Sequence, residues 1–261
     1  LMIKLNELFP YTFDKKYSKP VAYFSMEFAI HQPLKIYSCG LGFLSGSHLR
    51  SAYELKQNLI GIGILWKYGY YDQGRNQDQT LKPEWYEKTY SFLEDTGIKF
   101  QVPVHDQPVW VKAMYLPPDT FKSAPLFLLS TDVPENDYLS QTITHRLYDA
   151  DTAAKIAQSM ILGIGGAMLV DQLNFNPEIY HLNEAHAVSS VFYLYRKFGD
   201  INEIKKRLVF TTHTPEEAGN EKHDIFLCEK MSYFYGLPMN TVRELTGIKD
   251  DLFNHSLVAL R

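Results

Sequence analysis

Carboxylate and imidazole side chains follow three apolar segments of the chain, at the point where each segment ends. VAYF leads to Glu27, IYHL leads to Glu184 and His186, and LVF leads to His213. Acids and imidazoles that lie together can bind hydroxyl groups and exchange protons, as in a polar ligand site or a catalytic centre. The pattern therefore predicts one polar site built from three chain segments.

The site is expected in a crevice at one edge of a sheet. In open α/β sheets, ligands bind outside the carboxyl ends of the parallel strands. We expect the strand RLVFTTH to place His213 on the floor of this crevice, where Pro215 turns the chain away. One such strand end would be explained by routine capping, for example by Asn183 at a helix start. Three ends with acids and imidazoles favour a site.

Glycines in two further segments indicate two different roles. SCGLGFLSG contains Gly40, Gly42 and Gly46, so its backbone can approach a ligand closely, and the helix that follows offers N–H groups to an anion. The segment lacks the register of a dinucleotide motif and a Walker lysine, which makes the pattern weak by itself. LGIGG (162–166) lies within a periodic helix, and we interpret it as close helix packing.

We expect no metal site and no disulfide. The histidines of HLNEAH are five residues apart and the first lies on a strand, so they do not share a helix face. The cysteines, Cys39 and Cys228, form neither a disulfide framework nor a zinc spacing. Free thiols fit a reducing compartment, so we expect a cytoplasmic protein.

Composition argues against two classes of partner. The 261 residues carry 26 basic and 30 acidic side chains, a formal net charge of −4, which gives no electrostatic reason to expect nucleic acid. The most apolar run, MILGIGGAMLV, has 11 residues and is shorter than the roughly 20 that span a bilayer. The start, LMIKLNELFPYTF, lacks the apolar region of a signal peptide. We expect neither a nucleic acid nor a membrane as partner.

The elements that must position the site alternate between strand and helix. Strands are predicted at PVAYFS, LIGIGILW, VWVKAMYL, PLFLLST, EIYHL and RLVFTTH. Helices are predicted after SCGLGFLSG, from Asp151 or Thr152 as N-cap, over NEAHAVSSVFYLYRKFG to Gly199, and over most of the chain from Lys222. This alternation predicts an α/β fold, a Rossmann-like parallel sheet with helices on both faces, in a single domain over residues 1–261.

Several segments occur together, in the same order, in one enzyme family. The blocks are VAYFSMEFAI, IYSCGLGFLSGSHLRSA, LIGIGILWKYGYYDQ, LYDADTAAKIAQSMILGIGGAMLV, YHLNEAHAV and VFTTHTPEEAG. In these blocks the chain resembles the α-glucan (glycogen/maltodextrin) phosphorylase family, and most of all its short bacterial branch. The resemblance covers nearly all of the chain from about Pro20 onward.

The resemblance implies a fold, a reaction and a coenzyme. The chain would be the N-terminal half of a GT-B glycosyltransferase fold, facing a C-terminal domain across the active-site cleft. The implied reaction is reversible phosphorolysis of an α-1,4-glucan to glucose 1-phosphate with retention, in which pyridoxal phosphate (PLP) supports the substrate phosphate as acid and base. The lysine that holds PLP belongs to that second domain, which nothing in this chain matches. This polypeptide alone is therefore expected to be inactive.

The resemblance also assigns roles in the sugar pocket. His213 matches the histidine whose side chain meets the sugar 6-hydroxyl and whose backbone carbonyl faces the anomeric carbon, so it is the residue expected to take part in catalysis. Glu27 matches a carboxylate near the glucose pocket. Glu184 and His186 match the acid and the histidine of an Asn-acid-x-His block that lines this pocket.

A second group of residues matches the family's phosphate-binding loop. Gly40, Leu41 and Gly42 match a glycine loop whose N–H groups hold phosphate and sugar. The family usually has Gly-Gly-Leu-Gly here, and the first glycine is Cys39 in this chain. If that position requires a positive φ, cysteine would cost roughly 1 kcal/mol or more of strain.

The segment before the long helix departs further from the family. Asp151 matches an acidic residue of a loop that gates access to the site. Short phosphorylases tend to read Tyr-Gly-Gly-Asp where this chain has YDAD (148–151), and the usual Arg and Glu of the next helix are Lys155 and Ser159. We expect these changes to affect the gate more than the reaction class.

Two other functions stay open. One is a nucleotide-sugar glycosyltransferase of GT-B type, such as a starch or glycogen synthase, because these enzymes also carry an early glycine-rich loop. The other is a non-catalytic carbohydrate-binding homologue, which Cys39 and the altered gate would explain. The oligomeric state, including a homodimer, and the preferred glucan length are left open.

Overall fold

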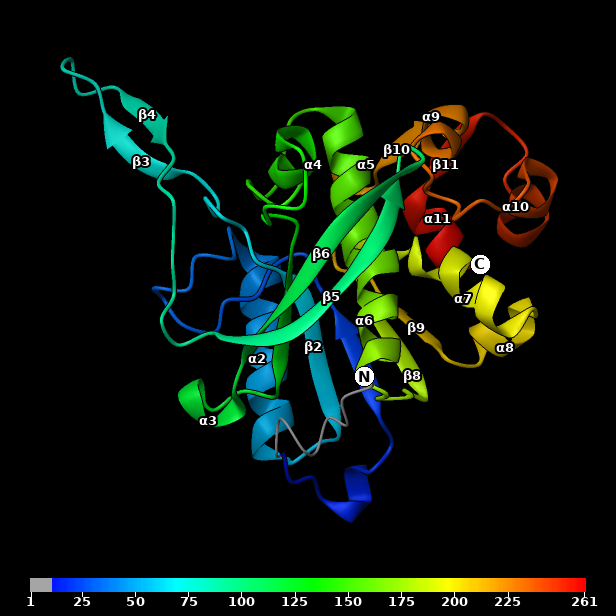
Figure 1. Cartoon of the computed structure of the whole chain (residues 1–261), viewed down its shortest axis with the longest axis horizontal. Helices are drawn as coiled ribbons and strands as arrows, with labels where there is room; N and C mark the ends of the chain where they lie inside the picture. Colours follow the sequence, from blue (N-terminus) through cyan, green and yellow to red (C-terminus); the bar gives the residue numbers. More distant parts are fainter. Residues whose placement is uncertain (1–10) are drawn as a thin grey trace.

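A seven-stranded mixed sheet runs through the part of the chain that the computed structural model describes, residues 11–261 (Figure 1). Residues 1–10 lie outside the described part, and they include most of LMIKLNELFPYTF, the segment in which we expect no signal peptide. The strands, in their order across the sheet, are β5 (Glu94–Val104), β6 (Gln107–Leu116), β7 (Leu126–Ser130), β2 (Leu59–Ile64), β1 (Val21–Phe24), β8 (Ile179–Asn183) and β9 (Leu208–Thr211).

The strands from β7 to β9 are parallel, and their order places a crevice beside β1. Numbered along the chain, these five strands of the described part lie in the order 3-2-1-4-5. The chain therefore moves outward from β1 to β2 and β7, and then crosses to β8 on the other side of β1. In doubly wound sheets this reversal marks the ligand crevice.

The predicted parallel sheet is confirmed from β7 to β9, but one edge is antiparallel, because β5 and β6 form a hairpin that pairs with β7. Two residues, His105 and Asp106, join the strands with φ angles of 52° and 57°. Such a tight turn usually contains Asn-Gly or Asp-Gly, so this sequence gives no turn signal. Side chains along β5 alternate between exposed and buried, as in a strand with one solvated face.

Helices cover both faces of the sheet, as predicted. Leu49 of α2 (Gly40–Glu54) packs against Gly61 of β2, whereas Ile62 of the same strand faces Gly166 of α6 (Gly166–Gln172). Successive side chains of a strand point to opposite faces, so α2 and α6 lie on opposite sides. The apolar strands β2 and β7 are buried along their whole length between these layers.

A long buried helix passes beneath the site. It consists of α5 (Thr152–Met160), the π-helical turn η2 (Ile161–Gly165) and α6, and Asp151 caps its start as predicted by accepting from Ala154 N at 2.8 Å. Among the described residues, the helical segment Thr152–Gln172 is long and apolar enough to cross a bilayer. The apolar helix is therefore longer than the 11-residue run MILGIGGAMLV noted in the sequence. However, 78% of its most apolar window is buried inside the protein, as in a core helix.

The predicted packing role of LGIGG is confirmed. A Cβ atom on Gly163 would lie 2.2 Å from Ser189 Oγ and 2.7 Å from Ala187 O. A Cβ atom on Gly166 would meet the Phe24 ring at 2.5 Å. These glycines allow the helix to contact both the sheet and the turn that follows β8.

The helix predicted over NEAHAVSSVFYLYRKFG is divided in the structure. A 3₁₀ turn, η3 (Ala185–Ala187), comes first, and α7 (Ser190–Phe198) ends at Gly199 as predicted. Glu184 has φ 62° and ψ 176°, a conformation that cannot continue into a helix.

The remaining elements lie around this framework, and the β3–β4 ribbon projects from the body (Figure 1). They are η1 (Lys15–Tyr17), β3 (Asp72–Arg75), β4 (Leu81–Glu84), α3 (Pro118–Phe121), α4 (Tyr138–Thr142), α8 (Ile201–Lys205), η4 (Glu217–Gly219), β10 (Lys222–Asp224), α9 (Ile225–Lys230), α10 (Met239–Thr246), β11 (Leu252–Asn254) and α11 (His255–Leu260). The region after Lys222 is mainly helical, as predicted, but it also contains the antiparallel pair β10–β11.

Candidate functional site

The predicted polar groups meet at the carboxyl ends of β1, β8 and β9, beside a pocket of about 680 Å³. Five of the eight predicted site residues line this pocket: Gly40, Leu41, Glu184, His186 and His213. Its position at the strand-order reversal is the one expected for an open α/β sheet. The pocket is large enough for a sugar-sized ligand.

Glu27 does not line the pocket but supports its wall. Its carboxylate is 1% exposed and accepts hydrogen bonds from Ser38 N at 2.6 Å, from Cys39 N at 3.2 Å and from the Tyr148 hydroxyl at 2.5 Å. A Cβ atom on Gly42 would lie 2.9 Å from Glu27 Oε2, so glycine is needed there for the close approach. Glu27 thus fixes the start of α2 and the ring of Tyr148.

The start of α2 carries the predicted glycine loop. The helix begins at Gly40, with Cys39 as N-cap, and the Cys39 side chain makes no capping hydrogen bond. A Cβ atom on Gly40 would have no neighbouring atom within 4 Å, so this end of the helix is open. Cys39 has φ −151°, outside the region that favours glycine. The strain considered for a cysteine at this position is therefore absent.

Glu184 organises the segment that carries His213. Its carboxylate, 5% exposed, accepts from Thr212 Oγ1 at 2.9 Å, His213 N at 2.6 Å and Thr214 Oγ1 at 3.1 Å. Its φ of 62° and ψ of 176° belong to a region that non-glycine residues rarely adopt, at a cost on the order of 1–3 kcal/mol. The hydrogen bonds from Thr212, His213 and Thr214 hold this conformation, so the hydroxyl groups on either side of the histidine serve to fix the Glu184 carboxylate.

A directed chain of hydrogen bonds fixes the proton on His213. Ser25 Oγ lies 3.0 Å from Glu27 O and must donate to it, because a carbonyl oxygen only accepts. Ser25 Oγ then accepts from Asn183 Nδ2 at 3.2 Å, and Asn183 Oδ1 accepts from His213 Nε2 at 3.1 Å. Neutral His213 is thereby held with its proton on Nε2, which leaves Nδ1 as a hydrogen-bond acceptor. Asn183 does not cap a helix here.

His186 also lines the pocket, and its ring has a buried nitrogen atom, Nδ1, without a hydrogen-bond partner among the described residues. Burial lowers the pKa of His186 below its usual value, although nearby carboxylates, Glu221 first, oppose this shift. The ring is therefore neutral at physiological pH and has an unused polar atom beside the pocket.

The pocket is also lined by polar residues that the sequence did not assign to the site, among them Tyr148, Lys155 and Glu221. Lys155 Nζ and Glu221 Oε1 lie 3.6 Å apart. Burial, and then the Glu27 carboxylate, raise the pKa of the Tyr148 hydroxyl far above its usual range, so it remains protonated. Tyr148 has φ 59°, and this turn directs the chain toward the site.

Asp151 does not line the pocket, because its carboxylate caps α5. Its neighbours Asp149 and Ala150 form part of the wall instead. The loop predicted to act as a gate therefore does border the pocket, through residues other than the one carried over.

A second pocket, of about 290 Å³, lies on the α2 side of His213. It is also lined by His48 and His181, and His181 Nε2 lies 2.7 Å from Thr211 Oγ1. Burial, followed by the charges of His48 and His213, lowers the pKa of His181 to about 4. His181 and His186 of HLNEAH thus lie in different pockets.

Sequence comparison identifies relatives for almost the whole chain. No family model matches it. A maltodextrin phosphorylase of Thermococcus litoralis is 34% identical over 270 residues, which cover 94% of this chain and 31% of that protein. A glycogen phosphorylase of Aquifex aeolicus is 30% identical over 272 residues, which cover 95% of this chain and 39% of that protein. The chain is related to the glycogen and maltodextrin phosphorylases. The predicted family relationship is confirmed.

A further relative of this chain has a name that gives no function. It is an uncharacterised protein of Methanocaldococcus jannaschii that is 47% identical over 243 residues, covering 93% of this chain and 46% of that protein. The chain thus spans less than half the length of each of these three relatives.

Proposed function

We propose that this chain is the sugar- and phosphate-binding half of an α-1,4-glucan phosphorylase that releases glucose 1-phosphate with retention. The observation that carries the proposal is the joint placement of His213, Glu184, His186 and the open start of α2 around one pocket at the strand-order reversal. The strand order and the helices on both faces also suit the N-terminal half of a GT-B fold. The relationship to phosphorylases supports the reaction class.

His213 is proposed to hold a sugar hydroxyl. Its Nε2 is engaged by Asn183, so Nδ1 is left to accept from a hydroxyl group. Glu184 fixes the backbone of the same residue through the 2.6 Å bond to His213 N. This arrangement positions both the ring and the carbonyl group of His213 before a ligand arrives, which lowers the entropic cost of reaching the transition state.

The start of α2 is proposed to bind phosphate. A helix N-terminus attracts anions through its unpaired N–H groups, and among residues 11–261 no side chain is hydrogen-bonded to the N–H groups of Gly40 and Leu41. Lys155 adds a positive charge to the pocket, but the carboxylate of Glu221 pairs with it. Anion binding is therefore assigned to the backbone N–H groups and not to surface charge. The acidic residues of the pocket, among them Glu184 and Glu221, can accept hydrogen bonds from sugar hydroxyl groups.

The coenzyme implied by the relationship, PLP, would face the same helix start. The open space at Gly40 leaves room for a phosphate-bearing group. When bound, the coenzyme would supply the phosphate that acts as acid and base toward the substrate phosphate. A second domain would contribute the lysine that holds it, so this chain would orient the sugar and exclude water.

The proposal is tested with the protein that contains this chain, loaded with PLP. We expect phosphate-dependent release of glucose 1-phosphate from maltodextrin, and a loss of at least about 100-fold in rate for His213→Ala. His105→Asn is the matched control, because His105 lies in the β5–β6 turn away from the pocket and Asn tolerates its φ of 52°. A folded, PLP-loaded protein that releases no glucose 1-phosphate would contradict the proposal.

The same assay separates the two alternatives. Transfer of glucose from a nucleotide sugar, without phosphorolysis, would identify a GT-B synthase. Binding of maltodextrin without turnover would identify a non-catalytic homologue. The unstrained backbone of Cys39 removes one reason for that last interpretation.

A further inference from the structure

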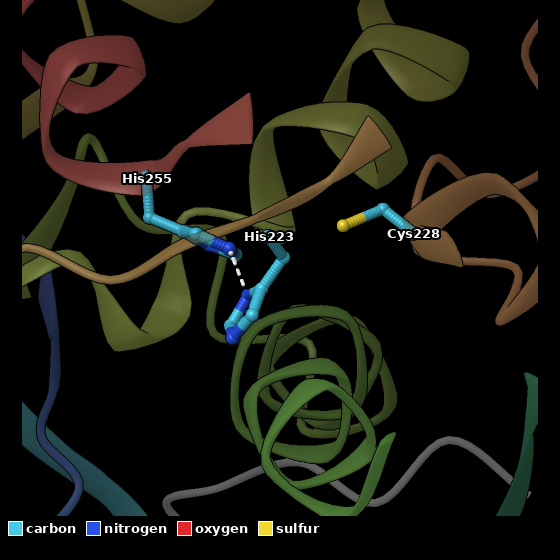
Figure 2. A group of neighbouring side chains, drawn as sticks. All are labelled: His223, Cys228 and His255. Carbon is cyan, nitrogen blue, oxygen red and sulfur yellow. Dashed lines mark hydrogen bonds between the residues drawn. The ribbon is translucent and has the colours of Figure 1, made fainter. Parts of the chain in front are cut away.

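Three metal-binding side chains meet in a part of the protein that the proposed site does not use. His223 lies on β10, Cys228 on α9 and His255 at the start of α11, and Figure 2 shows the three side chains directed toward one another. One donor atom from each residue lies within 4.8 Å of the other two. All three residues are buried, with exposed fractions of 8%, 0% and 3%.

The two rings are oriented as metal-binding histidines are. His223 Nδ1 and His255 Nε2 face each other at 2.8 Å and share one proton. On the outer side, His255 Nδ1 lies 2.9 Å from the Tyr233 hydroxyl, and His223 Nε2 lies 3.7 Å from a carboxylate oxygen of Glu221. Histidines that bind a metal typically present one nitrogen to the ion and hold the other N–H on an oxygen atom. His255 has such a partner in Tyr233, whereas the Glu221 carboxylate lies just beyond hydrogen-bond distance of His223 Nε2.

We propose that His223, Cys228 and His255 form a binding site for Zn²⁺. Two imidazoles and one thiolate are a donor set that suits zinc, with one position left for water or another ligand. The ion would replace the proton that now lies between the two rings. Each neutral histidine would then carry its proton on the outer nitrogen, toward Tyr233 or Glu221, and Cys228 would release its thiol proton to solvent.

The movement that binding requires is small. With Zn–N near 2.1 Å and Zn–S near 2.3 Å in tetrahedral geometry, donor atoms are about 3.3–3.6 Å apart. The ring nitrogens would therefore separate by roughly half an ångström from 2.8 Å, and the sulfur would approach from within 4.8 Å by on the order of 1 Å. Rotation of side chains supplies such shifts without a change of fold.

The ion would add a cross-link between β10, α9 and α11. β10 pairs with β11 through three residues, and His255 directly follows β11. Glu221, which contacts His223, also lines the candidate site. Zn²⁺ would thus stabilise the region that holds one wall of the pocket, without touching a ligand there.

The test uses the full-length protein, stripped of metal and titrated with Co²⁺ as a spectroscopic substitute for Zn²⁺. We expect a thiolate-to-cobalt charge-transfer band at one equivalent per chain, with displacement by Zn²⁺. Cys228→Ser should abolish the band, whereas Cys39→Ser should keep it. Cys39 lies beside His213 in the candidate site, so a band lost in Cys39→Ser instead would place the ion there and overturn the proposal.

A second variant guards against loss of folding in Cys228→Ser. Tyr233→Phe removes an outer partner but no ligand, so we expect the band to remain while Zn²⁺ binding weakens by roughly 10- to 100-fold. On the wild-type protein, Zn²⁺ should raise the melting temperature and Mg²⁺ should not. A wild-type protein that gives neither the band nor the Zn²⁺-dependent stabilisation contains only a hydrogen-bonded histidine pair, and the proposal is then wrong.

Discussion

Two glycines in one helical turn should respond in opposite ways to the same substitution. Gly163 and Gly165 both lie in the buried π-helical turn η2. A Cβ atom on Gly163 would lie 2.2 Å from Ser189 Oγ, 2.7 Å from Ala187 O and 2.9 Å from Ser190 N, and two of these three atoms belong to the backbone. On Gly165 the nearest atoms would be side-chain carbons at 3.5 Å, an ordinary contact distance.

The magnitudes follow from these contacts. Overpacking costs about 1–3 kcal/mol, and rigid backbone neighbours place Gly163→Ala at the upper end. Replacing glycine by alanine within a helix stabilises the helix by about 1 kcal/mol and offsets part of this cost. We therefore expect the free energy of unfolding to fall by about 2 kcal/mol in Gly163→Ala. Gly165→Ala should leave this free energy unchanged or raise it by up to about 1 kcal/mol.

The assay is urea unfolding followed by circular dichroism at 25 °C on both variants and the parent protein. Gly163→Ala should also weaken maltodextrin binding, because the displaced turn η3 carries His186. If the two variants are equally stable, the contact between the π-helical turn and the segment after β8 does not have the closeness described, and the account of how the helix supports the site is refuted.

Further predictions concern pH, capping and the cysteine. The pKa of His181 is about 4 in the folded protein and about 6.5 when unfolded, so below pH 6.5 the unfolded chain binds more protons and stability should fall until about pH 4. His181→Asn should flatten this fall in urea titrations across that range; an unchanged slope would contradict the shift. Asp151→Ala removes the cap on Ala154 N and should lower the free energy of unfolding by about 1 kcal/mol, measured by thermal unfolding. Cys39→Gly should not stabilise the protein, because φ is −151° there; a gain in melting temperature would indicate strain after all.

The sequence predicts those parts of the fold and site that depend on neighbouring residues in the chain. Apolar runs identify β1, β2, β7, β8 and β9, and the acids and imidazoles at their ends identify His213 and Glu184. The placement of these ends at one edge follows from the parallel connections, which short-range patterns also indicate.

The parts that the sequence does not predict depend on contacts between distant segments. Tyr148 reaches Glu27 across 121 positions of the chain, so neither residue signals the other locally. Glu221 enters the pocket wall from the position immediately before β10, after a segment without periodicity. The same holds for the pairing of His223 with His255, which only the β10–β11 ladder brings together.

A crystal structure of the protein that contains this chain, with glucose 1-phosphate bound, would show directly whether the pocket beside His213 and the start of α2 holds sugar and phosphate. We expect the phosphate within hydrogen-bond distance of the N–H groups of Gly40 or Leu41, and a sugar hydroxyl on His213 Nδ1. A ligand bound elsewhere, with this pocket closed or filled by protein side chains, would contradict this expectation.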